Sequence, residues 1–203
     1  MPRIGLADFQ SLKEKFLMLG QKPLGKFITK KGRKVEIWLP SIERLPALLV
    51  FVNRLVKEDT FLTLTGQPKT IEEERLWLKS NIDNIKSGRT ILVWAVYNHR
   101  IVGQCDVVRG GSRDWHTCTI GLMVDRDFRG EGIGKFLFEY ILKQAKKMPG
   151  LKIAKLYIFD DNEIGKSLYQ KFSFKEFARL PAGFYRRGKY SDALQMYKVL
   201  NDK

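Results

Sequence analysis

Three glycines alternate with other residues in the segment RDFRGEGIGKFLF, residues 126–138, between a charged stretch and an apolar one. Glycine at positions 130, 132 and 134 would let backbone amides approach an anion without a Cβ atom in the way. The apolar spacing that follows is typical of a helix, whose start carries unpaired N–H groups and a partial positive charge. The segment therefore predicts a phosphate-binding turn, with further positive charge from Arg126, Arg129 and Lys135.

Two common nucleotide-binding motifs match this segment poorly. A Rossmann site needs Gly-x-Gly-x-x-Gly in the first βα unit of a parallel sheet. Here the third glycine comes one residue early, and the segment lies past mid-chain, after strands that we expect to be antiparallel. A P-loop fails because no Gly-Lys-Ser/Thr follows the required four-residue gap. An ordinary glycine-rich turn remains open as the alternative.

The residues ahead of the glycines predict four strands and two helices. KVEIWLP, residues 34–40, alternates as a strand does, and Ser41 is placed to cap a helix. Thr70 and Glu73 form a capping-box signature for a second helix, which ends near Gly88. Two apolar runs split by NHR (98–100) predict a hairpin, and residues 116–124 predict the next strand. The apolar side of the first helix is formed by Leu45, Leu48, Leu49, Val52 and Val56.

The residues after the glycines complete a mixed α/β order. Helical spacing continues from Ile133 to Pro149, and LKIAKLYIF, residues 151–159, is the next strand. FKEFARL (174–180) and ALQMYKVL (193–200) are the closing strands. A short helix lies between the strand 151–159 and these closing strands, with an apolar side formed by Ile164, Leu168 and Phe172.

The charge of the chain is strongly positive, with 37 Lys and Arg against 22 Asp and Glu. Residues 1–34 alone hold nine basic residues against Asp8 and Glu14, so we expect a basic N-terminal extension (1–34) ahead of one domain (35–203). Such a segment suits RNA, a ribosome, an acidic protein or a phosphate-rich cofactor, and a solvated basic face is the alternative. The positive surface disfavours a purely cationic small substrate such as a polyamine.

The composition excludes several other classes. No apolar run reaches the ~20 residues of a membrane span, and the N-terminal residues MPRIGLADFQ lack a signal-peptide core. We therefore expect a cytoplasmic protein with no membrane contact. Cys105 and Cys118 have no CxxC spacing and no Cys/His cluster is present, so we expect reduced thiols and no metal.

Two segments resemble one known family. RGEGIG, residues 129–134, matches the Arg/Gln-x-x-Gly-x-Gly/Ala signature of the GNAT superfamily of N-acetyltransferases. LYIFDDNEIGKSLYQKFSF (156–174) is similar to that family's segment of strand, Asn, helix and Leu-Tyr, with Asn162 and Tyr169 at the family's spacing. The resemblance implies an α/β (α+β) GNAT acyltransferase fold: a mixed, mostly antiparallel twisted sheet flanked by helices. The fourth and fifth strands of this fold splay apart to admit acetyl-coenzyme A.

The resemblance also implies where acetyl-coenzyme A binds. Backbone groups of Leu122, Met123 and Val124 would pair with the pantetheine arm as a neighbouring strand does. Asn162 would lie near the pantetheine or cap the helix that follows it. The pyrophosphate would be held by the backbone amides of Arg129, Gly130, Glu131, Gly132, Ile133, Gly134 and Lys135.

The implied reaction is the attack of a neutral amine on a thioester, which needs three helpers. The backbone N–H of Met123 or Val124 would stabilise the oxyanion. Tyr169 would protonate the departing sulfur as general acid, and a role as a core-edge aromatic is its alternative. The base is open, because the glutamate that ribosomal-protein alanine acetyltransferases carry five residues before the Asn is Tyr157 here.

The candidates for the base are of three kinds. His116 would reach from the fourth strand, and an imidazole is suited to proton transfer near neutral pH. Glu58, Glu72 and Glu73 belong to the first two helices, where capping and solvated roles are the alternative. A chain of water molecules is the third option.

The acceptor amine is the least determined part of the prediction. RRGKYSDALQMYKVL (186–200) resembles the ending of family members that acetylate protein N-termini, ribosomal proteins or small amines, and Tyr185 and Tyr190 are candidates to line the acceptor pocket. The basic N-terminal segment favours a macromolecular or acidic acceptor. The alternatives are a small-molecule amine acetyltransferase, an RNA- or ribosome-binding module without turnover, and a dinucleotide-binding protein. Homodimer formation is left open.

Overall fold

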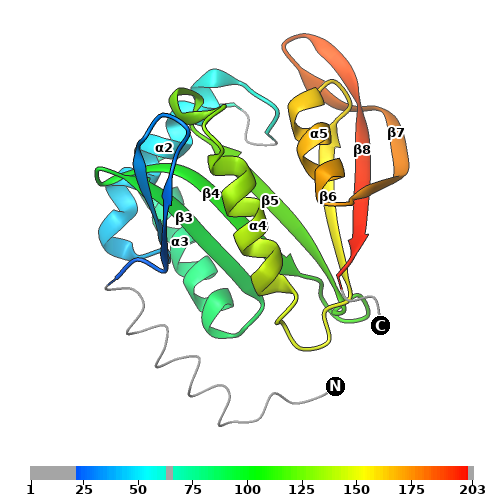
Figure 1. Cartoon of the computed structure of the whole chain (residues 1–203). Coiled ribbons are helices and arrows are strands. Elements are labelled where there is room, and N and C mark those ends of the chain that lie inside the picture. The colour runs from blue at the N-terminus through cyan, green and yellow to red at the C-terminus, as the bar shows by residue number, and fades with distance from the viewer. Residues whose placement is uncertain (1–21, 63–65, 201–203) are drawn as a thin grey trace.

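The computed structural model describes residues 22–62 and 66–200, and its elements appear in Figure 1. The strands are β1 (Gly25–Ile28), β2 (Lys34–Trp38), β3 (Thr90–Tyr97), β4 (Arg100–Arg109), β5 (Thr117–Val124), β6 (Ile153–Phe159), β7 (Lys175–Arg186) and β8 (Lys189–Val199). The α-helices are α2 (Leu45–Glu58), α3 (Ile71–Lys86), α4 (Ile133–Ala145) and α5 (Glu163–Lys171). Two 3-10 turns are η1 (Ile42–Arg44) and η2 (Arg126–Phe128).

The strands form one 8-stranded sheet in the order β1-β2-β3-β4-β5-β6-β8-β7. Only β5 and β6 pair in parallel, and every other neighbouring pair among the described strands is antiparallel. The hairpin between β3 and β4 turns at Asn98 and His99, which both have positive φ (46° and 64°), as a tight hairpin turn requires. This sheet and its helices confirm the predicted mixed, mostly antiparallel α/β fold.

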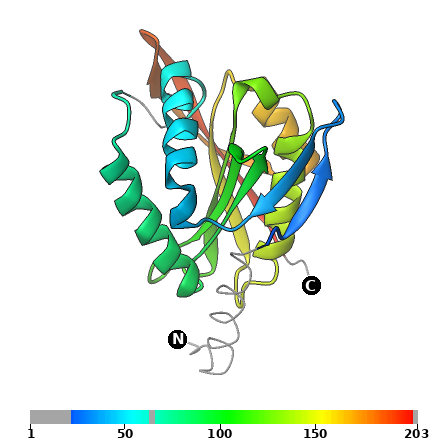
Figure 2. The same cartoon turned by 90° about the vertical axis from the view of Figure 1, so that its left-hand side faces the viewer.

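Helices cover both faces of the sheet (Figure 2). On one face, α2 and α3 enclose an apolar core that includes Leu48, Phe51 and Leu78. On the other face, α4 places Leu137, Phe138 and Ile141 in a larger core against β4, β5 and β6. The sheet therefore separates two sides of the molecule, and only an opening in the sheet can connect them. Among the described residues, no helix is long and apolar enough to cross a membrane.

The predicted capping box is present at the start of α3. The Thr70 side chain accepts a hydrogen bond from the backbone N–H of Glu73, and the Glu73 carboxylate accepts one from the N–H of Thr70. The prediction for Ser41 needs correction. Ser41 precedes η1, its side chain forms no cap hydrogen bond, and α2 begins four residues later at Leu45.

The predicted apolar side of α5 is also corrected. Ile164 is 86% exposed, whereas Tyr169 and Phe172 pack against the core. The reason is Gly165, since a Cβ atom there would stand 2.7 Å from Cδ1 of Ile158 on β6. This close approach turns the Gly165 side of the helix inward and carries Tyr169, one turn later, with it.

Part of the expected N-terminal extension belongs to the sheet. β1 pairs with β2 from Gly25 to Ile28, and the Phe27 ring stacks on Phe136 of α4 with centroids 4.6 Å apart. The expected boundary at residue 34 therefore falls inside a hairpin that is joined to the rest of the domain. The remainder of the basic segment, residues 1–21, lies outside the described residues.

Candidate active site

A wedge-shaped opening divides β5 from β6. The two strands pair only from Thr117 to Thr119 on β5 and from Ile153 to Lys155 on β6. Beyond these residues they diverge, toward the top of Figure 1. β5 continues to Val124 and stays paired with β4 over its whole length, so its other edge faces the opening. This edge could pair with an extended ligand as a strand would.

The alternation of the β4–β5 ladder decides which backbone groups face the wedge. The N–H of Asp125 donates to the carbonyl of Val102 (3.0 Å), so the odd-numbered residues of β5 direct their polar groups to β4. Leu122 and Val124 direct theirs into the wedge. This corrects the expectation for Met123, because its backbone faces Gln104 in the ladder and only its side chain lines the opening.

The glycine-rich segment forms a tight turn at the start of α4. Gly130 and Gly132 have φ values of 74° and 93°, which side chains rarely adopt, and Gly132 is the N-cap residue of α4. The N–H of Phe136 donates to the carbonyl of Gly132 (3.0 Å). The amides of Ile133, Gly134 and Lys135 lie in the first turn, where N–H groups have no partner within the helix. The turn therefore offers N–H donors without partners among residues 22–62 and 66–200, at the positive end of a helix dipole.

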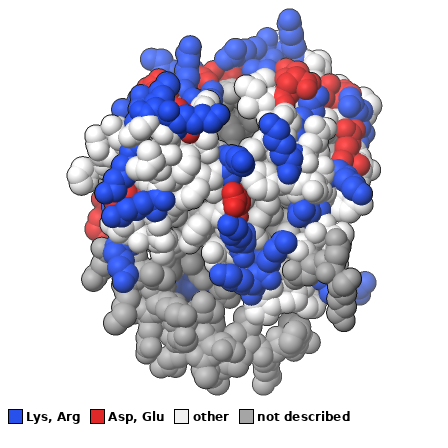
Figure 3. Space-filling view, in the orientation of Figure 1, with Lys and Arg blue, Asp and Glu red and all other residues white. Residues whose placement is uncertain are grey.

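The basic side chains of this turn do not all serve one purpose. Arg129 forms a two-pronged ion pair with Glu58 at the end of α2, and its Nε donates to the carbonyl of Val124 (3.0 Å). Arg126 and Lys135 are exposed. Figure 3 shows Lys and Arg spread over the face that carries α4. Glu58 therefore anchors the glycine turn through Arg129. Lys135 remains available to add positive charge.

A buried carboxylate ties the same turn to the N-terminal hairpin. Glu131 is 1% exposed, and Lys31 Nζ and Arg33 Nη1 each lie 3.4 Å from its Oε1. These are ion-pair distances without hydrogen-bond geometry, so neither carboxylate oxygen has a hydrogen-bond partner among the described residues. The backbone N–H of Lys30 also donates to the carbonyl of Glu131 (3.1 Å). The basic hairpin thus fastens the glycine turn in place.

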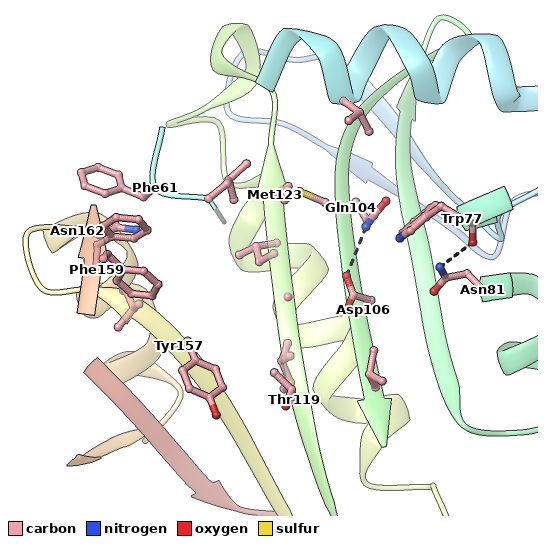
Figure 4. A pocket seen from close by; sticks show the side chains of 18 of the residues that line it. Phe61, Trp77, Asn81, Gln104, Asp106, Thr119, Met123, Tyr157, Phe159 and Asn162 are labelled. Carbon is pink, nitrogen blue, oxygen red and sulfur yellow. Dashed lines mark hydrogen bonds between the residues drawn. The ribbon is translucent and has the colours of Figure 1, made fainter. Parts of the chain in front are cut away.

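A cavity of about 830 Å³ runs through the wedge. Figure 4 shows Gln104 and Asp106 side by side on β4, with Met123 on β5 between them and the residues of β6. The side chains of α3 close the cavity on one side, and Asn162 and Tyr169 lie on the other. Its lining includes Phe61, Glu73, Glu74, Trp77, Asn81, Gln104, Asp106, Thr119, Gly121, Leu122, Met123, Tyr157, Phe159, Asn162, Tyr169 and Phe184.

Two of the predicted site residues meet in this lining. The Asn162 side chain caps α5 by accepting a hydrogen bond from the N–H of Gly165 (3.0 Å). The Tyr169 ring packs against Phe138 and Phe174, with centroids 5.0 and 6.3 Å away. Burial raises the pKa of the Tyr169 phenol well above its usual value, so the hydroxyl keeps its proton throughout the physiological range.

Other predicted residues lie away from the cavity. His116 precedes β5, at the end where β5 and β6 are still paired, and its carbonyl accepts hydrogen bonds from Lys152 and Ile153 (2.7 and 3.2 Å). It does not line the cavity, which corrects its placement as a base reaching in from the strand. Glu72 is exposed and pairs with Arg75. Glu73 lines the cavity but also completes the capping box.

The two tyrosines proposed for the acceptor pocket do not line it either. Tyr185 and Tyr190 are 61% and 72% exposed and pack on each other. Their neighbour Phe184 does reach the cavity, where its ring stacks on Phe159 with centroids 4.1 Å apart. The side chains alternate along the hairpin, so Phe184 faces the wedge and Tyr185 faces away.

Three polar side chains of the cavity wall are not among the site residues predicted from the sequence. Gln104 and Asp106 lie two residues apart on the same face of β4, and Glu74 is a buried residue of α3. Burial raises the pKa of both Asp106 and Glu74. A signal was present, because a strand reading IVGQCDVV carries two polar residues at same-face positions among apolar ones. Within the described residues, no group of His, Cys, Asp and Glu is suited to hold a metal.

Comparison with known proteins points to one family. The family model described as "Acetyltransferase (GNAT) family" matches residues 53–174, more than half of the chain. The fold is similar to that of a GNAT-family acetyltransferase from Streptococcus pneumoniae, with a TM-score of 0.74 and 23% identity over 82% of this chain and 99% of that one. An N-acetyltransferase from Staphylococcus aureus Mu50 gives a TM-score of 0.71 and 25% identity over 82% of this chain and 99% of its own. RimL, a ribosomal L7/L12 alpha-N-protein acetyltransferase in complex with coenzyme A, gives a TM-score of 0.73 and 16% identity over 88% of this chain and 98% of its own.

Proposed function

This chain belongs to the GNAT acetyltransferase family, and we propose that it moves an acetyl group from acetyl-coenzyme A to a primary amine. The wedge between β5 and β6 carries this proposal. It exposes an unpaired strand edge for an extended ligand, and it lies beside a helix N-terminus with free amides for an anion. A pantetheine arm ending in a pyrophosphate has both of these features in one molecule.

The donor would be held mainly by backbone groups. The N–H and carbonyl of Leu122 face the wedge and would bind the pantetheine arm, whereas the carbonyl of Val124 already accepts a hydrogen bond from Arg129 Nε. The amides from Gly130 to Lys135 would bind the pyrophosphate, because the glycines of the turn present no side chain to block it. Asn162 supports the proposal indirectly, since its cap on α5 fixes the helix that carries Tyr169.

Two groups would assist the transfer itself. Acetyl-coenzyme A supplies a thioester whose carbonyl carbon accepts the amine. The N–H of Val124 faces the wedge and is the better placed of the two predicted donors to the carbonyl oxygen. Tyr169 lines the cavity with its proton retained, and we assign it as the donor to the departing sulfur.

For the acceptor, we propose a primary amine that is either a protein N-terminus or a small molecule. RimL is described as acting on ribosomal L7/L12, and a basic segment such as Lys30 to Lys34 would suit a ribosomal partner. A small-molecule amine is the alternative, and it is favoured by the enclosed part of the cavity. A cytoplasmic location remains a prediction from the sequence.

The proposal is tested by following release of the coenzyme A thiol from acetyl-coenzyme A in the presence of primary amines. We expect amine-dependent release, with the amine product heavier by one acetyl group in mass spectrometry. Binding of acetyl-coenzyme A without transfer to any peptide or small amine would contradict the enzyme assignment. RNA binding that weakens with salt would then favour the binding-module alternative.

A further inference from the structure

Asp106 stands out in the cavity as a carboxylate with no role in holding the donor. We infer that Asp106 binds the ammonium group of the acceptor and takes its proton, with Gln104 as the residue that positions it. The inference rests on the proposed function and adds to it the proton acceptor and the class of amine. It is carried by the neighbours of Asp106 on β4 and β5.

The carboxylate of Asp106 lies over Gly121 of β5, where the missing side chain leaves room for it. Asp106 is directly opposite Gly121 in the β4–β5 register. A Cβ atom on Gly121 would stand 3.0 Å from Oδ1 and 3.2 Å from Oδ2 of Asp106. The carboxylate therefore projects over β5 itself, one residue before Leu122, where the unpaired edge of the strand faces the wedge.

Gln104 fixes the orientation of this carboxylate. The indole Nε1 of Trp94 donates to Gln104 Oε1 (3.0 Å), and an indole N–H can only donate. The amide nitrogen of Gln104 must then point the other way, and it donates to Asp106 Oδ1 across 3.4 Å (Figure 4). Trp94 is fully buried and Gln104 nearly so, which makes this a rigid support.

Asp106 has no cationic partner among the residues that the structure describes. Within the part of the chain that the structure describes, Asp106 forms no ion pair, although Lys and Arg exceed Asp and Glu overall by 37 to 22. Its single side-chain hydrogen bond comes from a neutral amide, which orients a carboxylate but leaves its charge and its second oxygen free. Asp106 is thus available to a cation that enters the cavity.

The other charged groups that face the cavity strengthen this preference. From the α3 side, Glu73 and Glu74 line the cavity, and so does Lys69, whose Nζ lies 3.9 Å from Glu73 Oε1, so that with Asp106 three carboxylates share one ammonium group. β6 contributes Tyr157 to the lining, and α5 contributes Tyr169. The cavity wall is therefore acidic inside a basic protein, and it favours an ammonium group.

The apolar lining defines the rest of the acceptor. Trp77 from α3 and Phe61, Tyr157, Phe159 and Phe184 from the other walls present aromatic rings to the cavity. An uncharged apolar or aromatic body would pack there, whereas a carboxylate near the amine would meet Glu73 and Glu74. The inferred acceptors are primary amines on neutral apolar groups, such as an arylalkylamine or a residue whose carboxyl is in amide form. The basic N-terminal segment predicted an acidic acceptor, and the cavity argues against it.

The proton balance of the inferred step is complete. The ammonium transfers one proton to Asp106, and the freed lone pair of the nitrogen forms the C–N bond to the acetyl carbon. The C–S bond breaks with its electron pair on sulfur, which receives the proton of Tyr169. The phenolate regains a proton from the acylated nitrogen, and Asp106 returns its proton to water.

We would measure binding of 2-phenylethylammonium by titration calorimetry to protein saturated with coenzyme A. The variants are Asp106→Asn and Asp83→Asn, the second of which removes the same charge from an exposed site on α3. We expect wild type and Asp83→Asn to bind the amine alike and Asp106→Asn to bind it at least 10-fold more weakly. We also expect kcat/KM for acetyl transfer to fall by about 10²-fold or more in Asp106→Asn only.

A second measurement separates this role from a structural one. Burial raises the pKa of Asp106, so the charged carboxylate is less favourable in the folded protein than in the unfolded chain. The stabilising contribution of the group is present below its unfolded pKa and is lost as the pH rises through the folded pKa. Asp106→Asn should therefore raise Tm at pH 7 and leave it unchanged below pH of about 4. A structural carboxylate would give a lower Tm at pH 7.

Equal amine affinity in Asp106→Asn and wild type would overturn the inference, and so would a wild-type protein that fails to bind the amine. In both cases, binding of acetyl-coenzyme A to the same samples would leave the proposed donor site intact. Free phenylalanine, which adds a carboxylate beside the amine, should be acetylated at least 10-fold less efficiently than phenylalaninamide. The opposite order would contradict the inferred class of acceptor.

Discussion

Gly121 on β5 and Asp106 on β4 lie directly opposite each other, and the space that a side chain would take on Gly121 is filled by the Asp106 carboxylate. The wedge between β5 and β6 begins beside this pair, since β6 stops pairing with β5 at Thr119. The Asp106–Gly121 pair thus places the carboxylate proposed for the acceptor beside the strand edge proposed for the donor.

The first prediction concerns this pair. Gly121→Ala should lower kcat/KM for acetyl transfer by about 10-fold, because the new Cβ atom forces the Asp106 carboxylate to shift by a few tenths of an ångström. Gly25→Ala is the matched control, since a Cβ atom on Gly25 meets nothing within 4 Å. Steady-state kinetics with saturating acetyl-coenzyme A measures the effect. Wild-type kinetics in Gly121→Ala would show that the carboxylate position does not matter.

Tyr169 provides the second prediction. Tyr169→Phe should reduce kcat by about 10²-fold and leave the affinity for acetyl-coenzyme A unchanged, because it removes the proton donor and keeps the ring that packs on Phe138. Tyr190→Phe removes an exposed hydroxyl outside the cavity and should behave as wild type. Turnover and calorimetric affinity are compared for both variants. An intact kcat in Tyr169→Phe would remove Tyr169 as general acid.

The third prediction is a dependence of stability on pH. Burial raises the pKa of Glu74 in the folded protein, so its stabilising contribution is present at acid pH and is lost as the pH rises through that pKa. Glu74→Gln should therefore have a higher Tm than wild type at pH 7, and the gain should vanish below pH of about 4. Glu72→Gln, on the exposed side of the same helix, is the control and should not raise Tm at pH 7. A lower Tm for Glu74→Gln at pH 7 would contradict this account of its burial.

The fourth prediction concerns the hairpin that fastens the glycine turn. Arg33→Ala should lower the free energy of unfolding by about 1–3 kcal/mol, because it leaves the buried Glu131 carboxylate with Lys31 alone. Lys26→Ala breaks a more exposed ion pair with Glu36 and should cost less than about 1 kcal/mol. Urea unfolding measures both values. An equal loss of unfolding free energy in the two variants would mean that the ion pair between Arg33 and Glu131 does not stabilise the fold more than an exposed one.

Local signals predicted much of this fold because each acts over a few residues. The capping box at Thr70 and Glu73 and the turn at Asn98 are formed as the sequence predicted. The glycines predict the start of a helix, and Gly132 is the N-cap of α4, whereas phosphate binding at this turn stays a prediction. Such features depend on backbone conformation and on neighbours in the chain.

What the sequence left unpredicted depends on contacts between distant segments. The inward side of α5 follows from the approach of Gly165 to Ile158, and apolar spacing alone placed Ile164 there instead. The sequence does not reveal at which end of β5 the strand separates from β6. His116 lies at the paired end, away from the opening. Asp106 was missed because its importance comes from its register with Gly121 on the next strand. Site residues of this kind require the sheet pairing.

The central claim, that acetyl-coenzyme A binds along the wedge and at the start of α4, is tested most directly by titration calorimetry with acetyl-coenzyme A. The comparison is between wild type, Gly132→Glu and Gly188→Glu, since both glycines have positive φ but Gly188 lies in the β7–β8 turn, away from α4. We predict micromolar binding by wild type and Gly188→Glu, and none by Gly132→Glu, whose carboxylate repels the phosphates at the helix N-terminus. Equal binding by a folded Gly132→Glu, or no binding by wild type, would contradict the account.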